Sequence, residues 1–197
     1  MSVKSFCAVG MVFCYTLSFG QALYKTSAPD KEKVVEELIY YYEVSSYTPP
    51  IPVDVTKTAN NSTPEGAAMQ LLEAMHSQDF DRWLRLWTPE SQQMMKTQYQ
   101  KNGTSPDVFK SGWSKAFNGR TVTLTKKVES GPYTFIVATF SPAGGAVGAA
   151  PAQPLDMEFV FKQVDGVWMA TQDLAADPVL NNWKNPNSVT RRVVRSK

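Results

Sequence analysis

Cysteine and histidine are nearly absent from this sequence. Both cysteines, Cys7 and Cys14, lie within the first 22 residues, so the rest of the chain has no thiol for a disulfide, for catalysis or for zinc binding. His76 is the only histidine, and we interpret it as a surface residue near the end of an expected helix. The sequence contains no spacing typical of a metalloprotease, a phosphate-binding loop or a calcium loop. We therefore expect no catalytic residue, no cofactor and no metal.

An excess of charge of either sign is also lacking. The formal net charge is +2, which gives no reason to expect a general attraction to nucleic acid or to an anionic membrane. Hydrophobic residues make up 43% of the 197 residues and include five Trp, eight Tyr and ten Phe. This composition is typical of a globular protein and supplies the core of one domain.

The amino terminus has the three parts of a secretory signal. Lys4 supplies the positive charge, the uncharged run Phe6–Phe19 is mostly apolar, and the small residues Gly20 and Ala22 follow it. The run is about 14 residues long, whereas a membrane-spanning helix needs roughly 20, which disfavours a retained anchor. We predict that residues 1–22 are a signal peptide cleaved after Gly20 or Ala22. The mature chain would then be periplasmic or secreted, with no membrane span.

Residues 23–62 predict a helix followed by a proline-rich arm. Between Asp30 and Ser46, apolar residues recur at helical spacing and charged residues occupy the other side. From Tyr47 to Ser62, three prolines and several Asn and Ser residues disfavour both a helix and a central strand. We interpret this second stretch as a linker or a wrapping arm.

Four further helices are indicated by their start signals. Thr63-Pro64-Glu65 and Thr88-Pro89-Glu90 each combine a capping hydroxyl, a proline tolerated in the first turn and an acid that complements the helix dipole. The predicted helices are Thr63–Ser77, a short one capped by Asp79 that carries Trp83 and Trp87, Thr88–Tyr99 and Val108–Phe117.

After Gly119 the period of the apolar residues changes from that of a helix to that of a strand. Arg120–Val128 alternates apolar and polar residues, whereas Tyr133–Phe140 is apolar at nearly every position, so both faces of that strand should be covered. Leu155–Val164 and Val167–Leu174 are joined by Asp165-Gly166, a strong hairpin signal. Helices followed by an antiparallel sheet predict an α+β fold.

Two short motifs extend this pattern of elements. They are Ser77-Gln78-Asp79-Phe80, at the bend between two helices, and Asp165-Gly166-Val167-Trp168, in the closing hairpin. With the order of helices and strands, they resemble the nuclear transport factor 2-like superfamily, which includes SnoaL-like and ketosteroid-isomerase-like proteins. The resemblance implies that the N-terminal helices pack in the concave face of a curved, cone-like antiparallel sheet. On this basis residues 63–178 form the domain and residues 179–197 a polar, basic tail, which we expect to be disordered.

That superfamily includes isomerases, dehydratases and proteins without chemistry, so the resemblance does not decide the reaction. Catalytic members that resemble ketosteroid isomerase place an acid and a tyrosine inside the cone. The polar candidates here are Tyr133, Asp156, Glu158 and Asp173. Asp156 and Glu158 alternate with apolar residues, which most simply places them on the outer face, and Asp173 is at a strand end where acids commonly cap turns. We therefore expect a protein that is not an enzyme. An isomerase or dehydratase is the third option, after the binding of a protein partner and the binding of a small apolar ligand.

Aromatic residues provide the candidate ligand pocket. If the cone is open, a small apolar ligand could lie against Trp83, Trp87, Trp113, Tyr133 and Trp168. In the alternative interpretation the same rings fill the cone as its core.

A partner-binding surface is the leading functional hypothesis. The strand Tyr133–Phe140 is apolar on both faces in a sheet that helices are expected to cover on only one, so its outer face should meet a protein partner or a second copy. Candidate residues for this surface are Tyr40, Tyr41, Tyr42, Tyr47, Arg191, Arg192 and Arg195.

The leader can be tested by intact-mass measurement of the protein from its producing cell. We expect the mature chain to begin at Gln21 or Leu23, and the double substitution Gly20→Trp/Ala22→Trp to leave the precursor uncleaved because the peptidase requires small residues there. Ala28→Trp, beyond both cleavage sites, is the matched control and should be processed normally. A purified wild-type chain that still begins at Met1 would contradict the signal-peptide prediction.

Overall fold

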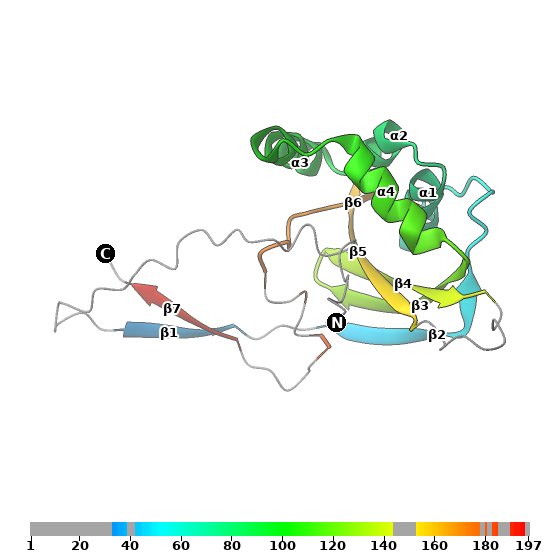
Figure 1. The fold of residues 1–197 in the computed structure, drawn as a ribbon. Helices are drawn as coiled ribbons and strands as arrows, with labels where there is room; N and C mark the ends of the chain where they lie inside the picture. Colours follow the sequence, from blue (N-terminus) through cyan, green and yellow to red (C-terminus); the bar gives the residue numbers. More distant parts are fainter. Residues whose placement is uncertain are drawn as a thin grey trace, which may run out of the picture.

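The computed structural model describes residues 42–143, 153–177, 180 and 183–184, together with the backbone of Lys33–Leu38 and Thr190–Arg195. The expected leader and the tyrosines Tyr40 and Tyr41 lie outside these residues. Four helices cover one side of a five-stranded sheet (Figure 1). No helix in the described part of the chain is long and apolar enough to cross a membrane.

The expected helix starts are confirmed. The helices are α1 (Pro64–His76), α2 (Phe80–Arg85), α3 (Pro89–Asn102) and α4 (Pro106–Phe117). The side chains of Thr63, Asp79 and Thr88 accept hydrogen bonds from backbone N–H groups in the first turns of α1, α2 and α3. These bonds satisfy donors that a helix leaves without a partner at its start. Ser105 precedes α4 but makes no such side-chain bond.

The predicted α+β fold is confirmed. The strands β2 (Glu43–Pro52), β3 (Arg120–Ser130), β4 (Tyr133–Pro142), β5 (Leu155–Val164) and β6 (Val167–Ala170) form an antiparallel sheet in the order β2-β3-β4-β5-β6. Asp165 and Gly166 have φ values of 50° and 80°, as a two-residue hairpin turn with both central residues at positive φ requires.

The main core lies between α1 and the sheet. The helix presents the small residues Ala67, Ala68 and Ala74 together with Leu71 and Leu72, all at most 4% exposed. Small side chains allow the helix to approach the strands closely. The facing side chains of the sheet are Val122, Leu124, Ile136, Ala138, Phe140, Met157, Phe159 and Phe161.

The expected wrapping arm lies against α1 and β6. The backbone N–H of Trp168 donates to the carbonyl of Asn61 over 2.9 Å, which covers the edge of β6. A Cβ atom at Gly66 would lie 1.9 Å from the carbonyl oxygen of Asn60, so only glycine fits where the arm crosses the first turn of α1.

The helix predicted for Asp30–Ser46 is wrong. The chain forms β1 (Lys33–Leu38) there and then begins β2 at Glu43. The periodic spacing was compatible with a helix, but the pairing of β2 with β3 overrides that local preference. The arm expected from Tyr47 therefore begins later, because β2 extends to Pro52. Its prolines are tolerated because β2 is an edge strand whose register shifts between Ser46 and Ile51.

The expectation of a disordered basic tail is also wrong. Thr190–Arg195 forms β7, which pairs antiparallel with β1 to give a separate two-stranded sheet, called the terminal ribbon below. The register places Glu37 opposite Arg191 and Glu36 opposite Arg192. Pairing with an oppositely charged strand gives the basic segment a partner that its composition did not indicate. Figure 1 shows the terminal ribbon apart from the five-stranded sheet.

The outer face of the sheet is covered by the chain itself. A second cluster of buried residues, called the outer cluster below, consists of Val128, Phe135, Val137, Val160 and Trp183. Tyr42, Leu174 and Leu180 pack against it. The expectation that β4 is buried on both faces is confirmed. A second protein is not needed to cover the outer face, because residues of this chain already do so.

Trp183 is the principal cover of this face. Its side chain is 8% exposed, and the Nζ atoms of Lys126 and Lys184 lie 6.0 and 5.6 Å from its ring centroid. Lys184 also forms an ion pair with Glu158 on β5. The apolar ring, the two cations beside it and the ion pair together hold this residue against the sheet.

Substituting Trp183 tests this cover. We expect Trp183→Ala to lower the free energy of unfolding by about 3 kcal/mol, because it removes a large buried ring from the outer cluster. Met94→Ala on α3, where the side chain is 44% exposed, should change it by less than about 0.5 kcal/mol. Urea denaturation of both variants provides the comparison. A loss for Trp183→Ala no greater than that of the control would show that the sheet is not covered in this way.

Candidate functional site

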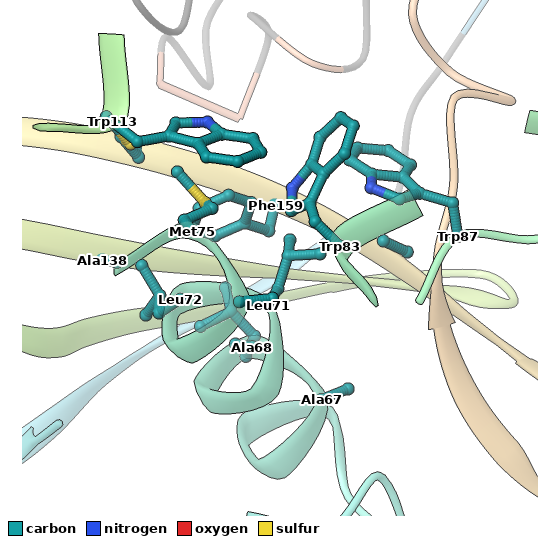
Figure 2. Close-up of a cluster of buried hydrophobic side chains, with 14 of the residues drawn as sticks. Ala67, Ala68, Leu71, Leu72, Met75, Trp83, Trp87, Trp113, Ala138 and Phe159 are labelled. Carbon is teal, nitrogen blue, oxygen red and sulfur yellow. The ribbon is translucent and has the colours of Figure 1, made fainter. Parts of the chain in front are cut away.

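The tryptophans predicted to line a ligand pocket form the core. Trp83, Trp87 and Trp113 are 3%, 6% and 3% exposed, and the centroid of Trp83 lies 5.2 Å from that of Trp87 and 5.3 Å from that of Trp113 (Figure 2). Phe80 and Phe109 pack into the same cluster. These contacts support the alternative interpretation, in which the rings fill the space between helices and sheet.

The other two pocket candidates, Trp168 and Tyr133, lie outside this cluster. Trp168 is half-buried on β6 and packs against the edge of the main core. Tyr133 belongs to the opposite side of the sheet, where it packs against the outer cluster. The five predicted pocket residues therefore do not surround one space.

Two polar atoms in the aromatic core lack a partner. The indole Nε1 of Trp87 and the hydroxyl of Tyr99 are buried, and no other described group is hydrogen-bonded to them. Burial raises the pKa of Tyr99 far above its usual value, so the phenol stays neutral. An unpaired buried hydroxyl costs about 1–3 kcal/mol of stability.

The hydroxyl of Tyr99 gives a simple test. We expect Tyr99→Phe to raise the free energy of unfolding by about 1 kcal/mol, because the ring contacts remain and the unpaired polar atom is removed. Tyr47→Phe is the matched control, since the Tyr47 hydroxyl donates to Glu65 Oε1 over 2.7 Å and its removal should destabilise. Thermal denaturation shows whether each substitution raises or lowers the stability. A destabilising Tyr99→Phe would show that this hydroxyl has a partner in solution.

The candidate acids lie on the outer face or at its edge, not among the helices. Asp156 accepts a hydrogen bond from Thr139 Oγ1 over 2.7 Å, and Glu158 pairs with Lys184. The outward orientation expected for Asp156 and Glu158 is therefore present. Among the described residues, no three His, Cys, Asp or Glu side chains are grouped as a metal site would require.

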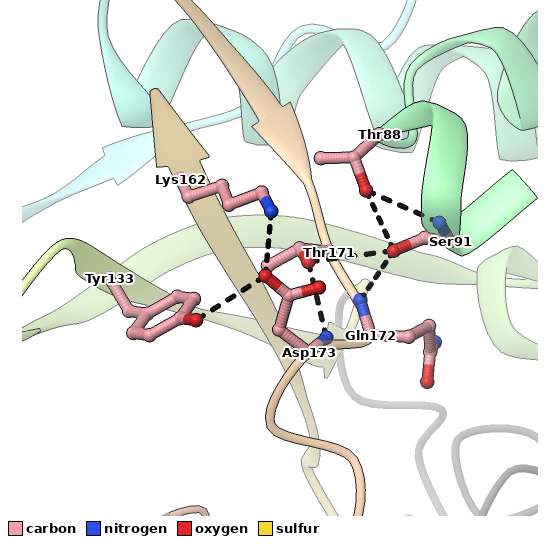
Figure 3. A network of polar contacts seen from close by, with 7 residues as sticks. All are labelled: Thr88, Ser91, Tyr133, Lys162, Thr171, Gln172 and Asp173. Carbon is pink, nitrogen blue, oxygen red and sulfur yellow. Dashed lines mark hydrogen bonds and ion pairs between the residues drawn. The ribbon is translucent and has the colours of Figure 1, made fainter. Parts of the chain in front are cut away.

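Asp173 and Tyr133 meet at the end of this face, which the sequence did not predict. Asp173 Oδ2 lies 2.7 Å from Lys162 Nζ and accepts a hydrogen bond from the Tyr133 hydroxyl over 3.3 Å (Figure 3). Burial alone would raise the pKa of Asp173, but hydrogen bonds from Lys162 and Thr171 outweigh it and lower that pKa. Asp173 is thus a paired carboxylate and not a proton acceptor with a raised pKa.

Behind Asp173, a chain of hydroxyls joins α3 to the segment after β6. The Ser91 hydroxyl accepts from the backbone N–H of Gln172 over 2.9 Å and from Thr88 Oγ1 over 2.8 Å, and it lies 3.4 Å from Thr171 Oγ1 (Figure 3). Thr88, Ser91 and Thr171 are all buried. The network satisfies buried polar groups at the start of a helix, which is a structural role.

The pairing of Asp173 makes a pH-dependent contribution to stability. Because the pKa of Asp173 is lower in the folded chain than that of an unperturbed aspartate, this contribution is present above about pH 4 and is lost as the pH falls through the folded-state pKa. We expect Asp173→Asn to cost up to about 1 kcal/mol at pH 7, since both partners are about a quarter exposed. This cost should shrink as the pH falls below about 4 and the carboxylate of Asp173 takes up a proton, as measured by urea denaturation. Glu43→Gln, at an exposed site, is the control, and a cost that does not change with pH would contradict the ion pair.

Two of the tyrosines predicted for a partner surface, Tyr42 and Tyr47, lie on opposite faces of the sheet. Tyr42 packs against the outer cluster, whereas Tyr47 packs against the main core, where burial and the hydrogen bond to Glu65 raise its pKa. Tyr42 and Tyr47 therefore do not share one surface. Arg191, Arg192 and Arg195 lie on β7 in the terminal ribbon.

The sequence did not identify a pair of adjoining hollows beside His76. One has a volume of about 420 Å³ and is lined by His76, Gln78, Ser114, Lys115, Phe117 and Asn118. The other, of about 330 Å³, is lined by His76 and Phe117 together with residues of the arm and of β3. His76 is exposed as expected, and its ring lies edge-on to Phe117 with centroids 5.2 Å apart.

Gln78 shapes one end of these hollows. It follows α1 with a φ of 59°, a left-handed conformation that costs a residue other than glycine roughly 1 kcal/mol. Its Nε2 donates to Ser114 Oγ over 2.7 Å and so connects the end of α1 to α4. The lack of a glycine at this helix end was a sequence signal for a strained residue. That α4 lies next to it is visible only in the structure.

Comparison with known proteins identifies no family. No family matches the chain, and no curated protein matches it. One solved structure is similar: a SEC-C motif containing protein from Rhodopseudomonas palustris, with a TM-score of 0.38 and 18% identity over 59% of this chain and 81% of that chain. This likeness is too slight to indicate fold or function, so the resemblance to the nuclear transport factor 2-like superfamily stays a prediction.

Proposed function

We propose that this chain is a non-enzymatic, exported interaction module that associates with a second copy of itself through the terminal ribbon, with another envelope protein as the alternative partner. The observation that carries the proposal is the pairing of β1 with β7 as a two-stranded sheet separate from the domain. A two-stranded sheet is marginally stable in water by itself, and no other described strand pairs with either of its outer edges. Strand addition at such an edge is a common mode of protein recognition.

The charges of the two strands favour a second copy as the partner. The β7 sequence TRRVVR contains three arginines, whereas β1, KVVEEL, contains two glutamates. Like charges disfavour the pairing of β7 with β7, and opposite charges favour the pairing of the β7 edge with a β1 edge. A second copy supplies that acidic edge, as the intrachain register already does with Glu36 opposite Arg192.

The remaining features support binding over catalysis. The aromatic rings that would contact a small apolar ligand pack on one another, and the acids that an isomerase or dehydratase would use lie on the outer side of the sheet. The export part of the proposal rests on the leader pattern of residues 1–22. The cone-like superfamily resemblance is compatible with this role but does not assign it.

Native mass spectrometry of the mature chain, with and without ribbon substitutions, tests the proposal. We expect the wild-type chain to form dimers or larger species at about 100 μM, and Arg191→Glu/Arg192→Glu to abolish them, because an acidic β7 would repel the acidic β1 edge of a second copy. Adding Glu36→Arg/Glu37→Arg to that variant restores opposite charges and should restore association.

The matched control places the same charge change elsewhere. Arg85→Glu/Lys96→Glu changes two exposed cations on α2 and α3, and should leave association unaltered. A wild-type chain that stays monomeric at this concentration, and that crosslinks to no envelope protein, would overturn the proposed function.

A further inference from the structure

Two hydrogen-bond donors in the hollows beside His76, the side chains of His76 and Arg120, lack partners among the described residues. Among the described residues, neither the imidazole of His76 nor the guanidinium of Arg120 makes a hydrogen bond or an ion pair. Both side chains line the smaller hollow, and Lys115 lines the larger one that adjoins it. Groups of this kind donate hydrogen bonds well to carboxylates and phosphates.

We propose that the groove formed by these hollows binds a small organic carboxylate, whose charged end lies at His76 and Arg120 and whose apolar body lies on Phe117, Val53 and Val122. The proposal goes beyond the proposed function, because the groove is formed by α1, α4, β3 and the arm and not by the terminal ribbon. The two can therefore succeed or fail separately.

The apolar part of the groove explains the preference for an organic anion over an inorganic one. Phe117 is the last residue of α4 and is half-buried between the ring of His76 and that of Phe140, with centroids 5.2 and 5.1 Å away. Val53 is half-buried and Val122 is buried, and both line the smaller hollow. Hollows of a few hundred Å³ that combine an apolar floor with a few polar groups are typical of sites for small molecules.

The charge of the groove favours an anion over a cation. Asp54 is its single carboxylate among the lining residues, and that group is already engaged. Its Oδ1 accepts from the hydroxyl of Thr56 over 2.6 Å, and its Oδ2 lies 3.1 Å from Lys57 Nζ. These interactions hold the pKa of Asp54 at about 2, so its carboxylate stays ionised and paired.

Gln78 holds one end of the groove in a strained backbone conformation. A glycine would adopt its φ of 59° without strain but would lose the bond to Ser114 that joins the two helix ends lining the larger hollow. Backbone strain of this kind often occurs where a protein holds a ligand. The strained backbone of Gln78 and the unpartnered donors of His76 and Arg120 are independent observations at the same groove.

An NMR titration with octanoate tests the proposal, using amide shifts of the mature, full chain. We expect saturable binding of one octanoate per chain with a Kd on the order of 0.1–1 mM, and shifts concentrated at His76, Phe117 and Arg120. Octanamide, which has the same body without the charge, should bind about tenfold more weakly. Acetate, which has the charge without the body, should also bind about tenfold more weakly.

Single substitutions distinguish this groove from other binding modes. Arg120→Gln should weaken octanoate binding about tenfold and His76→Gln several-fold, without a change in melting temperature, because both side chains lie at the surface. Lys96→Gln, an exposed cation on α3 away from the groove, is the matched control and should bind as the wild type does.

Three results would overturn the proposal. The first is the absence of saturable octanoate binding at about 10 mM. The second is equal binding of octanoate and octanamide, with shifts centred on Trp83 and Trp113, which would place the ligand in the aromatic core. The third is unchanged octanoate affinity in Arg120→Gln and His76→Gln.

Discussion

The burial of β4 on both faces is the constraint on which the rest of the structure depends. Phe135 and Val137 point to one side of the sheet and Ile136, Ala138 and Phe140 to the other, and all five are at most 2% exposed. Each side therefore needs an apolar cover, since exposing these side chains would forfeit about 25 cal/mol for each Å² of apolar surface. The helices cover one side, and the segment around Trp183 covers the other. In the chain, the helices come before β3–β6, and the second cover comes after them.

Local signals predicted the elements whose causes are local. The Thr-Pro-Glu starts, the cap at Asp79 and the Asp165-Gly166 turn each act within about four residues, and all are in the structure as expected. Asp30–Ser46 was different because its spacing fitted a helix, while its actual partners, β3 and β7, lie far away in the sequence. Pairing at such distances leaves no signature in either segment alone.

The candidate site could be predicted less well than the fold. The sequence identified the aromatic residues and the acids but not their arrangement, because burial depends on which face of a helix or strand meets the core. Trp83 and Trp113 pack together on one side of the sheet, whereas Tyr133 and Asp173 meet on the other. His76, which is correctly expected at the surface, borders a groove formed with α4 and β3, and no local pattern connects those elements. The features left available for recognition are thus peripheral to both cores.

NOE spectroscopy of the mature chain tests most directly whether Trp183 covers the outer face of the sheet. We expect cross-peaks between the indole protons of Trp183 and the methyl protons of the outer cluster, namely those of Val128, Val137 and Val160. Such peaks require protons within about 5 Å, a separation that a buried, packed ring satisfies. If the indole lacks these cross-peaks while the β4 side chains show their contacts to α1, Trp183 does not cover the outer face, and that face is exposed.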